Sequence, residues 1–420
     1  MKSEVINIIK KTKFPYLLVS QILSQVTINM MNFLLLVKIY EKTDSTFAVS
    51  MLWISYALPL ILIGPFASTL VDILDRRIVL MIANLLQSFT ILYYALFFKE
   101  NIFLLYGITF FYSFINQFYV PAETASVSHL VKKDELPFAS GMLYLTQQLS
   151  LVAGFALASV FNQFFGFSIS LLLCSLFLFI AFVSVIFLPK MKLTEMEKMP
   201  PEESIKMFFQ SIYSGYKFIR SSKNILMTFS ILIAVQIMFS IIIVSVPMIA
   251  KTVIKIPANL SGIYLVIPAG IGSILGAFNI PAFLKNKWRK KYLIRRSLLL
   301  LSILIFLETF VVYYLPNPVN IIVSAVIVFF LGIFFTGVYI PAQTFLQEST
   351  PNDYKGRIFG NMWFVTTIST VIPLIFYGVI TEIFGIRFVM VSISLVCFLM
   401  YYFSKNSHKF FKNNIETSKV

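Results

Sequence analysis

Two carboxylate residues stand inside long apolar stretches of this sequence, where a charged group is costly. Glu123 lies in FYVPAETA (118–125), and Glu308 lies in LSILIFLETFVVYY (301–314). A carboxyl group in apolar surroundings can carry a proton, so both residues are candidates for proton coupling. A salt bridge near Lys132 would explain Glu123 without such a role, and a structural hydrogen bond would explain Glu308.

Four amide side chains near the N-terminus form a second group with chemical potential. Gln21, Gln25, Asn29 and Asn32 fall within about 80° of one another on a helical projection. Polar groups that face lipid are penalised, so this narrow stripe is expected to face the interior of a helix bundle. It could line a solute cavity, or it could only hydrogen-bond one helix to another.

Further amides lie within later apolar segments. They are Asn116, Gln117, Gln147, Gln148 and Gln236. A mostly apolar and aromatic cavity with scattered amides suits a small amphipathic organic molecule. A dedicated sugar or phosphate site would carry more fixed polar or charged groups.

Other kinds of chemistry find little support in the sequence. The only cysteines are Cys174 and Cys397, each inside an apolar run, and there are two histidines. No metal-ligand or disulfide spacing is present, so we expect no metal and no cofactor. A membrane enzyme would need clustered catalytic side chains at one depth, and no GxxxxGK[ST] loop for ATP occurs. We therefore expect no enzymatic activity.

These residues must be positioned by membrane-spanning helices. The 420 residues are 58% hydrophobic and only 12% charged, whereas soluble domains are about 25% charged. Lipid-exposed backbone must satisfy its own hydrogen bonds, which favours helices of roughly twenty residues. The predicted spans are 14–38, 46–71, 77–98, 102–128, 138–162, 166–189, 224–250, 258–284, 292–315, 319–345, 357–381 and 385–404.

The positive charges orient these twelve predicted helices. The net charge is +16, which in a soluble protein would raise the question of nucleic acid, but here the cations flank apolar runs. With the N-terminus in the cytoplasm, 28 of the 34 Lys and Arg residues fall on the cytoplasmic side. This split predicts that both termini are cytoplasmic, and it makes membrane lipids rather than nucleic acid the expected partner.

The chain divides into two halves with related sequences. We expect a six-helix bundle at 1–189, an amphipathic linker at 190–223, a second bundle at 224–404 and a basic cytoplasmic tail at 405–420. FYVPAETA (118–125) recurs as VYIPAQTF (338–345) near the ends of the fourth and tenth predicted helices. Parallel repeats of six helices are an architecture that alternating-access transporters use.

At this point the sequence resembles the major facilitator superfamily, and within it the bacterial branch of macrolide-efflux and enterobactin-export proteins. The resemblance covers nearly the whole chain. It rests on EKTDS (41–45), GPFASTLVDILDRRIVL (64–80), VPAETASVSHLVKKDEL (120–136) and TPNDYKGRIFG (350–360). It implies an all-α fold of twelve transmembrane helices in two bundles, with helices one, four, seven and ten around a central cavity.

The segment 64–80 matches the family's gating motif. By this resemblance Gly64 and Pro65 form the small-residue helix end, and Asp72 accepts hydrogen bonds from the start of helix eleven near Gly356 and Arg357. Arg76 and Arg77 would stay in the headgroup region. Asp72 could instead be only a helix cap, and the arginines could serve only membrane topology.

Some positions depart from the family pattern. Ser68 and Ile73 replace a usual glycine and a usual basic residue, Gly154–Phe155 replaces Gly-Pro, and Tyr112 stands where the family places a buried arginine. That arginine is linked in the family to proton coupling, so its absence puts ordinary proton antiport in doubt.

Together these observations predict a secondary active transporter. We expect a monomeric, multi-pass protein of a bacterial inner (plasma) membrane that exports a small amphipathic compound, such as a drug, macrolide or siderophore, in exchange for protons. An importer or a transporter of lipid-like solutes with the same fold is one alternative. A sensor or scaffold that no longer transports is another.

Overall fold

The computed structural model is all-helical in the residues that it describes. These are residues 12–97, 101–132, 135–191, 206, 210, 213–220, 223–285, 290–350 and 352–406. Ten of its helices are long and apolar enough to cross a membrane. Two of the ten contain a sharp turn that divides each into two spans, which gives the twelve segments that the sequence predicts.

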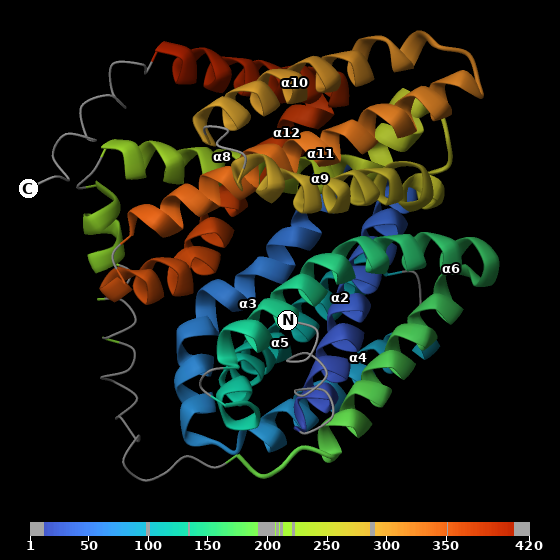
Figure 1. Cartoon of the computed structure of the whole chain (residues 1–420). Helices are drawn as coiled ribbons and strands as arrows, with labels where there is room; N and C mark the ends of the chain where they lie inside the picture. The colour runs from blue at the N-terminus through green and yellow to red at the C-terminus, as the bar shows by residue number, and fades with distance from the viewer. Residues whose placement is uncertain are drawn as a thin grey trace, which may run out of the picture. The chain divides into compact units, whose positions relative to one another are not determined.

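Figure 1 labels the long helices in the order in which they follow one another along the chain. They are α2 (Phe14–Thr43), α3 (Thr46–Ile73), α4 (Arg76–Phe97), α5 (Ile102–Leu130), α6 (Leu136–Ile186), α8 (Lys223–Ile249), α9 (Ile267–Lys285), α10 (Lys290–Phe310), α11 (Val319–Ser349) and α12 (Asn352–Asn406). Short π and 3-10 turns (Ala250–Ile254, Ala258–Leu260 and Gly262–Val266) join α8 to α9, where the sequence predicted one helix from 258. A further 3-10 turn, Val312–Tyr314, follows α10.

Glycine makes both of the sharp turns. Gly166 divides α6 at φ 78° and ψ 172°, and Gly385 divides α12 at φ 78° and ψ 162°. This region of backbone space is open to glycine and strongly disfavoured for other residues. The turns fall where the predicted helices 166–189 and 385–404 begin, so the two halves of the chain use the same device at matching positions.

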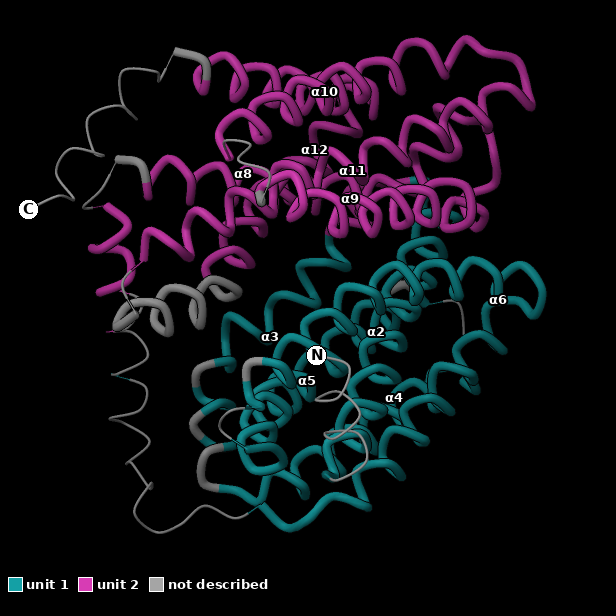
Figure 2. Tube along the Cα trace, in the orientation of Figure 1, with its two compact units in different colours: residues 1–44, 51–209 teal, residues 45–50, 210–420 magenta. Residues whose placement is uncertain are grey.

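The chain forms two compact units, coloured separately in Figure 2. Unit 1 comprises Met1–Asp44 and Met51–Phe209, and unit 2 comprises Ser45–Ser50 and Gln210–Val420. Most of the predicted linker and tail lies outside the described residues. Residues 213–220 are helical, with Tyr213 and Tyr216 exposed and Ile219 buried.

In unit 1, α2 packs closely against the first half of α6. A Cβ atom at Gly154 would lie 2.5 Å from Cβ of Asn29 and 2.8 Å from the carbonyl oxygen of Val26. The rings of Phe33 and Phe155 pack next to this point, with centroids 5.0 Å apart. The glycine therefore permits a close crossing of the two helices, as small residues do in membrane proteins.

In unit 2, α9 and α11 cross in a similar way. A Cβ at Gly272 would lie 1.9 Å from the carbonyl oxygen of Phe329, and one at Gly332 would lie 2.0 Å from that of Ala269. Backbone thus lies against backbone on both sides of this crossing. Figure 1 shows α9 and α11 next to each other along this stretch.

Each unit contains its own serine–serine contact between two helices, which the sequence did not reveal. In unit 1, Ser88 of α4 and Ser175 of α6 donate to each other's carbonyl oxygens at 2.9 and 3.0 Å. In unit 2, Ser394 of α12 donates to the carbonyl oxygen of Ser302 in α10 at 2.9 Å. The third and sixth spans of each unit are therefore joined by equivalent hydrogen bonds, which supports an origin from a repeated six-helix unit.

Candidate functional site

The sequence-predicted carboxylate Glu123 lies deep in unit 1, near the end of α5. Its side chain is 5% exposed. Tyr119, one helical turn earlier, donates its hydroxyl proton to Oε1 of Glu123 at 3.4 Å. Within the described part of the chain, this hydroxyl is the hydrogen-bond partner of the carboxyl group, and the salt bridge to Lys132 that the sequence left open is not formed.

A chain of polar atoms continues from Tyr119 into two other helices. The hydroxyls of Tyr119 and Ser20 of α2 lie 3.2 Å apart. Nδ2 of Asn84 in α4 donates to Oγ of Ser20 at 3.0 Å, and Oδ1 of Asn84 is buried without a hydrogen-bond partner. The four residues join α2, α4 and α5, and none of them is more than 5% exposed. We refer to Ser20, Asn84, Tyr119 and Glu123 as the polar chain.

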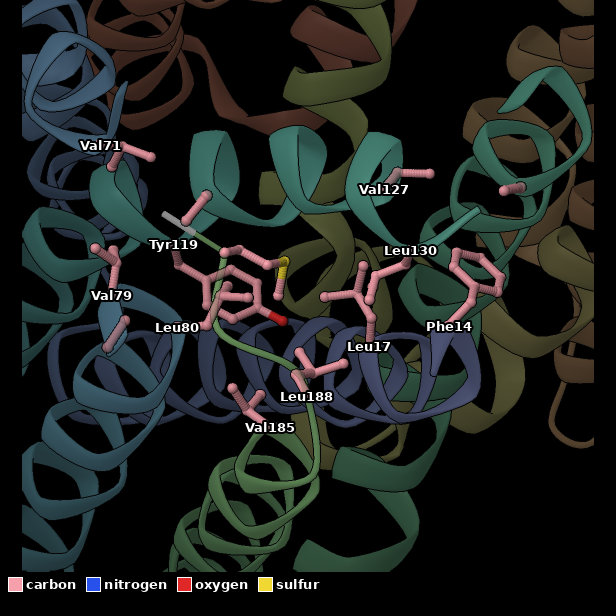
Figure 3. Packing of buried hydrophobic residues seen from close by; sticks show 14 of the residues in the cluster. Phe14, Leu17, Val71, Val79, Leu80, Tyr119, Val127, Leu130, Val185 and Leu188 are labelled. Carbon is pink, nitrogen blue, oxygen red and sulfur yellow. The ribbon is translucent and has the colours of Figure 1, made fainter. Parts of the chain in front are cut away.

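Apolar side chains surround the polar chain. Tyr119 belongs to a buried cluster with Leu17 of α2, Leu80 of α4 and Leu188 beyond α6, and Figure 3 shows its ring among these residues. Hydrogen bonds and interactions between charges are stronger in surroundings of low dielectric constant. An ionised carboxylate that has no cation as its partner is costly in free energy there. The carboxyl group of Glu123 is thus connected by hydrogen bonds to polar groups of α2 and α4 inside apolar surroundings.

The second carboxylate, Glu308, lies in unit 2 at 1% exposure. Ser324 of α11 donates its hydroxyl proton to Oε1 of Glu308, whereas Oε2 is buried without a partner. Asn320 lies one turn before Ser324 and donates to the carbonyl oxygen of Ile254 at 2.6 Å. Glu308 thus has one hydroxyl partner, which suits either a proton-carrying group or a structural hydrogen bond between α10 and α11.

The amide stripe of α2 is divided between different surroundings. Gln21 is buried and bonds to α6, because its Nε2 donates to the carbonyl oxygen of Leu143 at 2.8 Å and its Oε1 accepts from Thr146 at 2.6 Å. Gln25 and Asn29 are half-buried. Asn32 is buried, and its Oδ1 has no hydrogen-bond partner. Gln21 therefore holds α2 to α6, whereas Nδ2 of Asn29 donates within α2 to the carbonyl oxygen of Gln25 at 2.7 Å.

The remaining amides are spread over three helices, α5, α6 and α8. Asn116 and Gln117 of α5 are buried, and Gln117 donates to the carbonyl oxygen of Ser113 at 3.0 Å. Gln147 in α6 and Gln236 in α8 are half-buried. Gln148 is exposed and donates to the hydroxyl of Tyr144 at 3.1 Å.

The predicted gating segment is described only in part. Gly64 lies in α3 beside Gln117, whose Oε1 would be 3.7 Å from an added Cβ. Arg76 is buried and donates from Nη1 to the carbonyl oxygen of Ala125 at 3.2 Å, and it also pairs with the imidazole of His129. Arg77 donates to the carbonyl oxygen of Ile186. The described part of the structure leaves out the side chains of Pro65, Asp72 and Arg357 and the surroundings of Gly356.

These contacts show what Arg76 bonds to within unit 1. Arg76 is 8% exposed and holds the end of α5 to the start of α4, while its predicted place in the headgroup region stays a prediction. Beside it, Oδ1 of Asp75 accepts from the backbone N–H of Arg77 at 3.0 Å and from that of Met191 at 3.3 Å. Asp75 was not singled out from the sequence, although an acid just before a helix start is a recognisable cap.

Reasoning from the sequence also missed Glu382 of α12. Its Oε1 accepts from the backbone N–H of Phe47 at 3.2 Å and from the hydroxyl of Ser45, and Ser45 in turn accepts from the N–H of Ala48 at 3.1 Å. All of these residues belong to unit 2. The free N–H groups at the start of α3 are thus capped by two residues.

The described residues contain no group of three or more His, Cys, Asp or Glu side chains that could hold a metal ion. Cys174 and Cys397 are both buried as free thiols, and Sγ of Cys397 lies 3.6 Å from Sδ of Met238.

Comparisons with known proteins bear on the family and the fold of the chain. The sequence profile of the Major Facilitator Superfamily matches residues 17–374. The uncharacterized MFS-type transporter YfiS of Bacillus subtilis (strain 168) is 24% identical over 353 residues, which cover 83% of this chain and 81% of that protein.

Two kinds of solved structure share the fold. A mutant of the nucleoside transporter NupG superimposes with a TM-score of 0.73 at 12% identity, covering 94% of this chain and 100% of that one. A bacterial homologue of the iron transporter ferroportin, in an inward-facing state, superimposes with a TM-score of 0.69 at 15% identity, covering 93% and 98%. At these identities the likeness shows the fold alone.

Proposed function

The chain belongs to the Major Facilitator Superfamily, and on this premise we propose that it exports small amphipathic organic compounds by alternating access in exchange for protons. The superfamily membership makes it a multi-pass membrane transporter of a small-molecule substrate. Export, the amphipathic substrate class and the coupling ion are the parts that we propose.

The observation that carries the proposal is the buried carboxyl group of Glu123. It lies at 5% exposure and is joined through Tyr119 to Ser20 and Asn84. Polar and ionisable residues within the membrane are costly, so their presence favours a function such as proton transfer. In our proposal Glu123 takes up a proton in one state of the transport cycle and releases it in another.

Glu123 could take the role that a buried arginine has in related transporters. The position of that arginine holds Tyr112, which is fully buried in α5. No cation pairs with Glu123 among the described residues, and in our proposal its carboxyl group is therefore able to take up and release a proton. This reasoning makes Glu123 the primary coupling residue and Glu308, on α10, a secondary candidate.

Half-buried amide side chains on α2, α6 and α8 support the proposed substrate class. Gln25, Asn29, Gln147 and Gln236 are half-buried amides, and aromatic residues make up 16% of the chain. A few amides on an apolar and aromatic surface suit a solute with one or two polar groups on an apolar body. Macrolides, siderophores and lipophilic dyes have this character, and a lipid-like solute is the alternative within the same class.

We keep the gating role of Asp72 as part of the proposal. It would cap the start of the eleventh span near Gly356 and Arg357 when the cytoplasmic side is closed. We also propose that the protein works as a monomer in a bacterial inner membrane, with both termini in the cytoplasm, as the distribution of its cations favours.

An accumulation assay tests the proposal. The chain would be expressed in a bacterial host that lacks its major efflux pumps, and the accumulation of macrolides, dyes and siderophores would be compared with an empty-vector strain. We expect lower accumulation of at least one compound, and we expect a protonophore to abolish the difference. Equal accumulation across a broad panel would reject export of this substrate class.

The variant Glu123→Gln separates proton coupling from simple loss of folding. The amide keeps the size of the side chain and still accepts from Tyr119, so the protein should fold, but it cannot carry the proton. Glu135→Gln, at the start of the next helix, is the matched control because Glu135 is half-buried outside the polar chain. Equal export by Glu123→Gln and Glu135→Gln would remove Glu123 from the mechanism.

A further inference from the structure

The start of α10 carries an unusual concentration of positive charge. Its first two turns hold Lys290, Lys291, Arg295 and Arg296. The first turn contains no acidic residue. Lys290 forms an ion pair with Glu348 of α11. Within the described part of the chain, this is the one ion pair that these four cations form.

This arrangement is unfavourable for an isolated helix. The N-terminal end of a helix carries a partial positive charge, so cations there are repelled. Lys291 and Arg295 stand four residues apart, where like charges on a helix also repel each other. The positive-inside rule explains cations in the loops that flank a membrane span. It does not require cations within the first turns of the helix. An anion bound at this point would compensate both repulsions.

The two arginines are held by aromatic rings. Cζ of Arg295 lies 5.1 Å from the ring centroid of Tyr401 in α12, and its Nη2 donates to the Tyr401 hydroxyl at 3.5 Å. Cζ of Arg296 lies 4.0 Å from the ring centroid of Tyr292, one turn earlier on α10. In the described structure neither guanidinium meets a carboxylate.

Contact with a ring face leaves N–H donors of a guanidinium available, and in the described structure only Nη2 of Arg295 is engaged with the Tyr401 hydroxyl. The planar group is attracted to a ring through its face, while its N–H donors point outward from its edge in a fork that matches phosphate oxygens. Tyrosine is also enriched at the level of the lipid headgroups. Tyr292 is 40% exposed and Tyr402, next to Tyr401, is 49% exposed, so this end of α10 is accessible from the surface.

We propose that Arg295 and Arg296, with Lys291 beside them, bind the phosphate of an anionic phospholipid headgroup at the basic end of α10. The lipid tail would then run along the apolar surface of the same helix, where Ile303 and Phe306 are 45% and 48% exposed. This site lies within unit 2 alone, and the inference does not depend on which solute the protein moves. It therefore goes beyond the proposed export function.

Lipid binding to the purified protein tests this site without any transport measurement. The full chain would be reconstituted in phosphatidylcholine alone or in an equal mixture of phosphatidylcholine and phosphatidylglycerol, and bound phosphatidylglycerol would be quantified. Each arginine near an anionic surface is worth about a fivefold change in affinity, so Arg295→Gln with Arg296→Gln should weaken binding about 25-fold. Arg387→Gln is the matched control.

Arg387 is a suitable control because it has the same chemistry at the opposite end of α10. Its Cζ lies 3.5 Å from the ring centroid of Tyr313, which follows the C-terminal end of that helix. We expect Arg387→Gln to bind phosphatidylglycerol like the unaltered protein. Equal loss in this variant would mean that only total charge matters, and it would overturn the site.

Two further comparisons keep the proposal falsifiable. If the double glutamine variant fails to fold, Arg295→Lys with Arg296→Lys keeps the charge but loses the planar fork, and we still expect weaker binding. Inorganic phosphate should not displace the lipid at matched ionic strength, because the tail contributes to binding. Unchanged lipid affinity in both double variants, or full displacement by phosphate, would contradict a lipid-headgroup site.

Discussion

Replacing Gly154 with alanine should destabilise the protein, because the added methyl group has no room. Its Cβ would lie 2.5 Å from Cβ of Asn29, 2.8 Å from the carbonyl oxygen of Val26 and 3.1 Å from the backbone N of Met30. Carbon atoms in ordinary contact are about 3.5–4.0 Å apart, so α2 and α6 would have to separate by about 1 Å. Two of these three atoms belong to the backbone, which cannot turn away as a side chain can.

The size of the effect can be estimated from overpacked protein cores. Forcing extra atoms into a well-packed site costs about 1–3 kcal/mol. For a unit of about 200 residues this corresponds to roughly 2–4 °C in Tm for each kcal/mol. Thermal unfolding of the purified protein, followed by loss of monodisperse material, measures the shift.

Gly141 is the matched control on the same helix. An added Cβ there meets nothing within 4 Å, and alanine is favoured over glycine within helices by about 0.5–1 kcal/mol. Gly141→Ala should therefore be neutral or slightly stabilising. If Gly154→Ala melted at the same temperature as Gly141→Ala, the close crossing of α2 and α6 described above would be wrong.

Three other predictions concern unit 2. Gly332→Ala should lower Tm at least as much as Gly154→Ala, since its Cβ would lie 2.0 Å from the carbonyl oxygen of Ala269; an unchanged Tm would contradict the α9–α11 contact. Glu382→Ala removes a cap from α3 and should cost about 1 kcal/mol, whereas Glu382→Gln should recover part of that loss; equal melting of all three proteins would argue against the cap. Glu308→Gln should stay within about 1 kcal/mol of the unaltered protein because the amide oxygen still accepts from Ser324, and a much larger loss, measured by the same melting assay, would mean that Glu308 is held as an anion.

The sequence predicted the number and order of the spans well because each depends on local composition. Runs of apolar residues, glycine at 166 and 385 and cations between the runs are visible without any tertiary information. The repeated motif around Pro121 and Pro341 also indicated two related halves. The short π and 3-10 turns between α8 and α9 were not predicted, since they depend on how the chain reverses near Pro257.

The contacts within the candidate site were much harder to predict. Tyr119 could have been paired with Glu123 from their spacing of one helical turn, but Ser20 and Asn84 come from other helices. A helical projection identified the amide stripe of α2, yet it could not show that Gln21 bonds to α6. The same limit applies to Glu382, which lies 335 residues beyond the N–H group that it caps.

Solute movement driven by a proton gradient in reconstituted vesicles tests the central claim most directly. Purified protein would be placed in liposomes that contain a lipophilic dye or macrolide, and its movement would be followed with and without an imposed pH difference. The account predicts gradient-driven movement by the unaltered protein. It also predicts that Glu123→Gln loses this response while still exchanging solute between the two sides. Movement that equals that of protein-free liposomes, or that ignores the gradient in both proteins, would contradict the account.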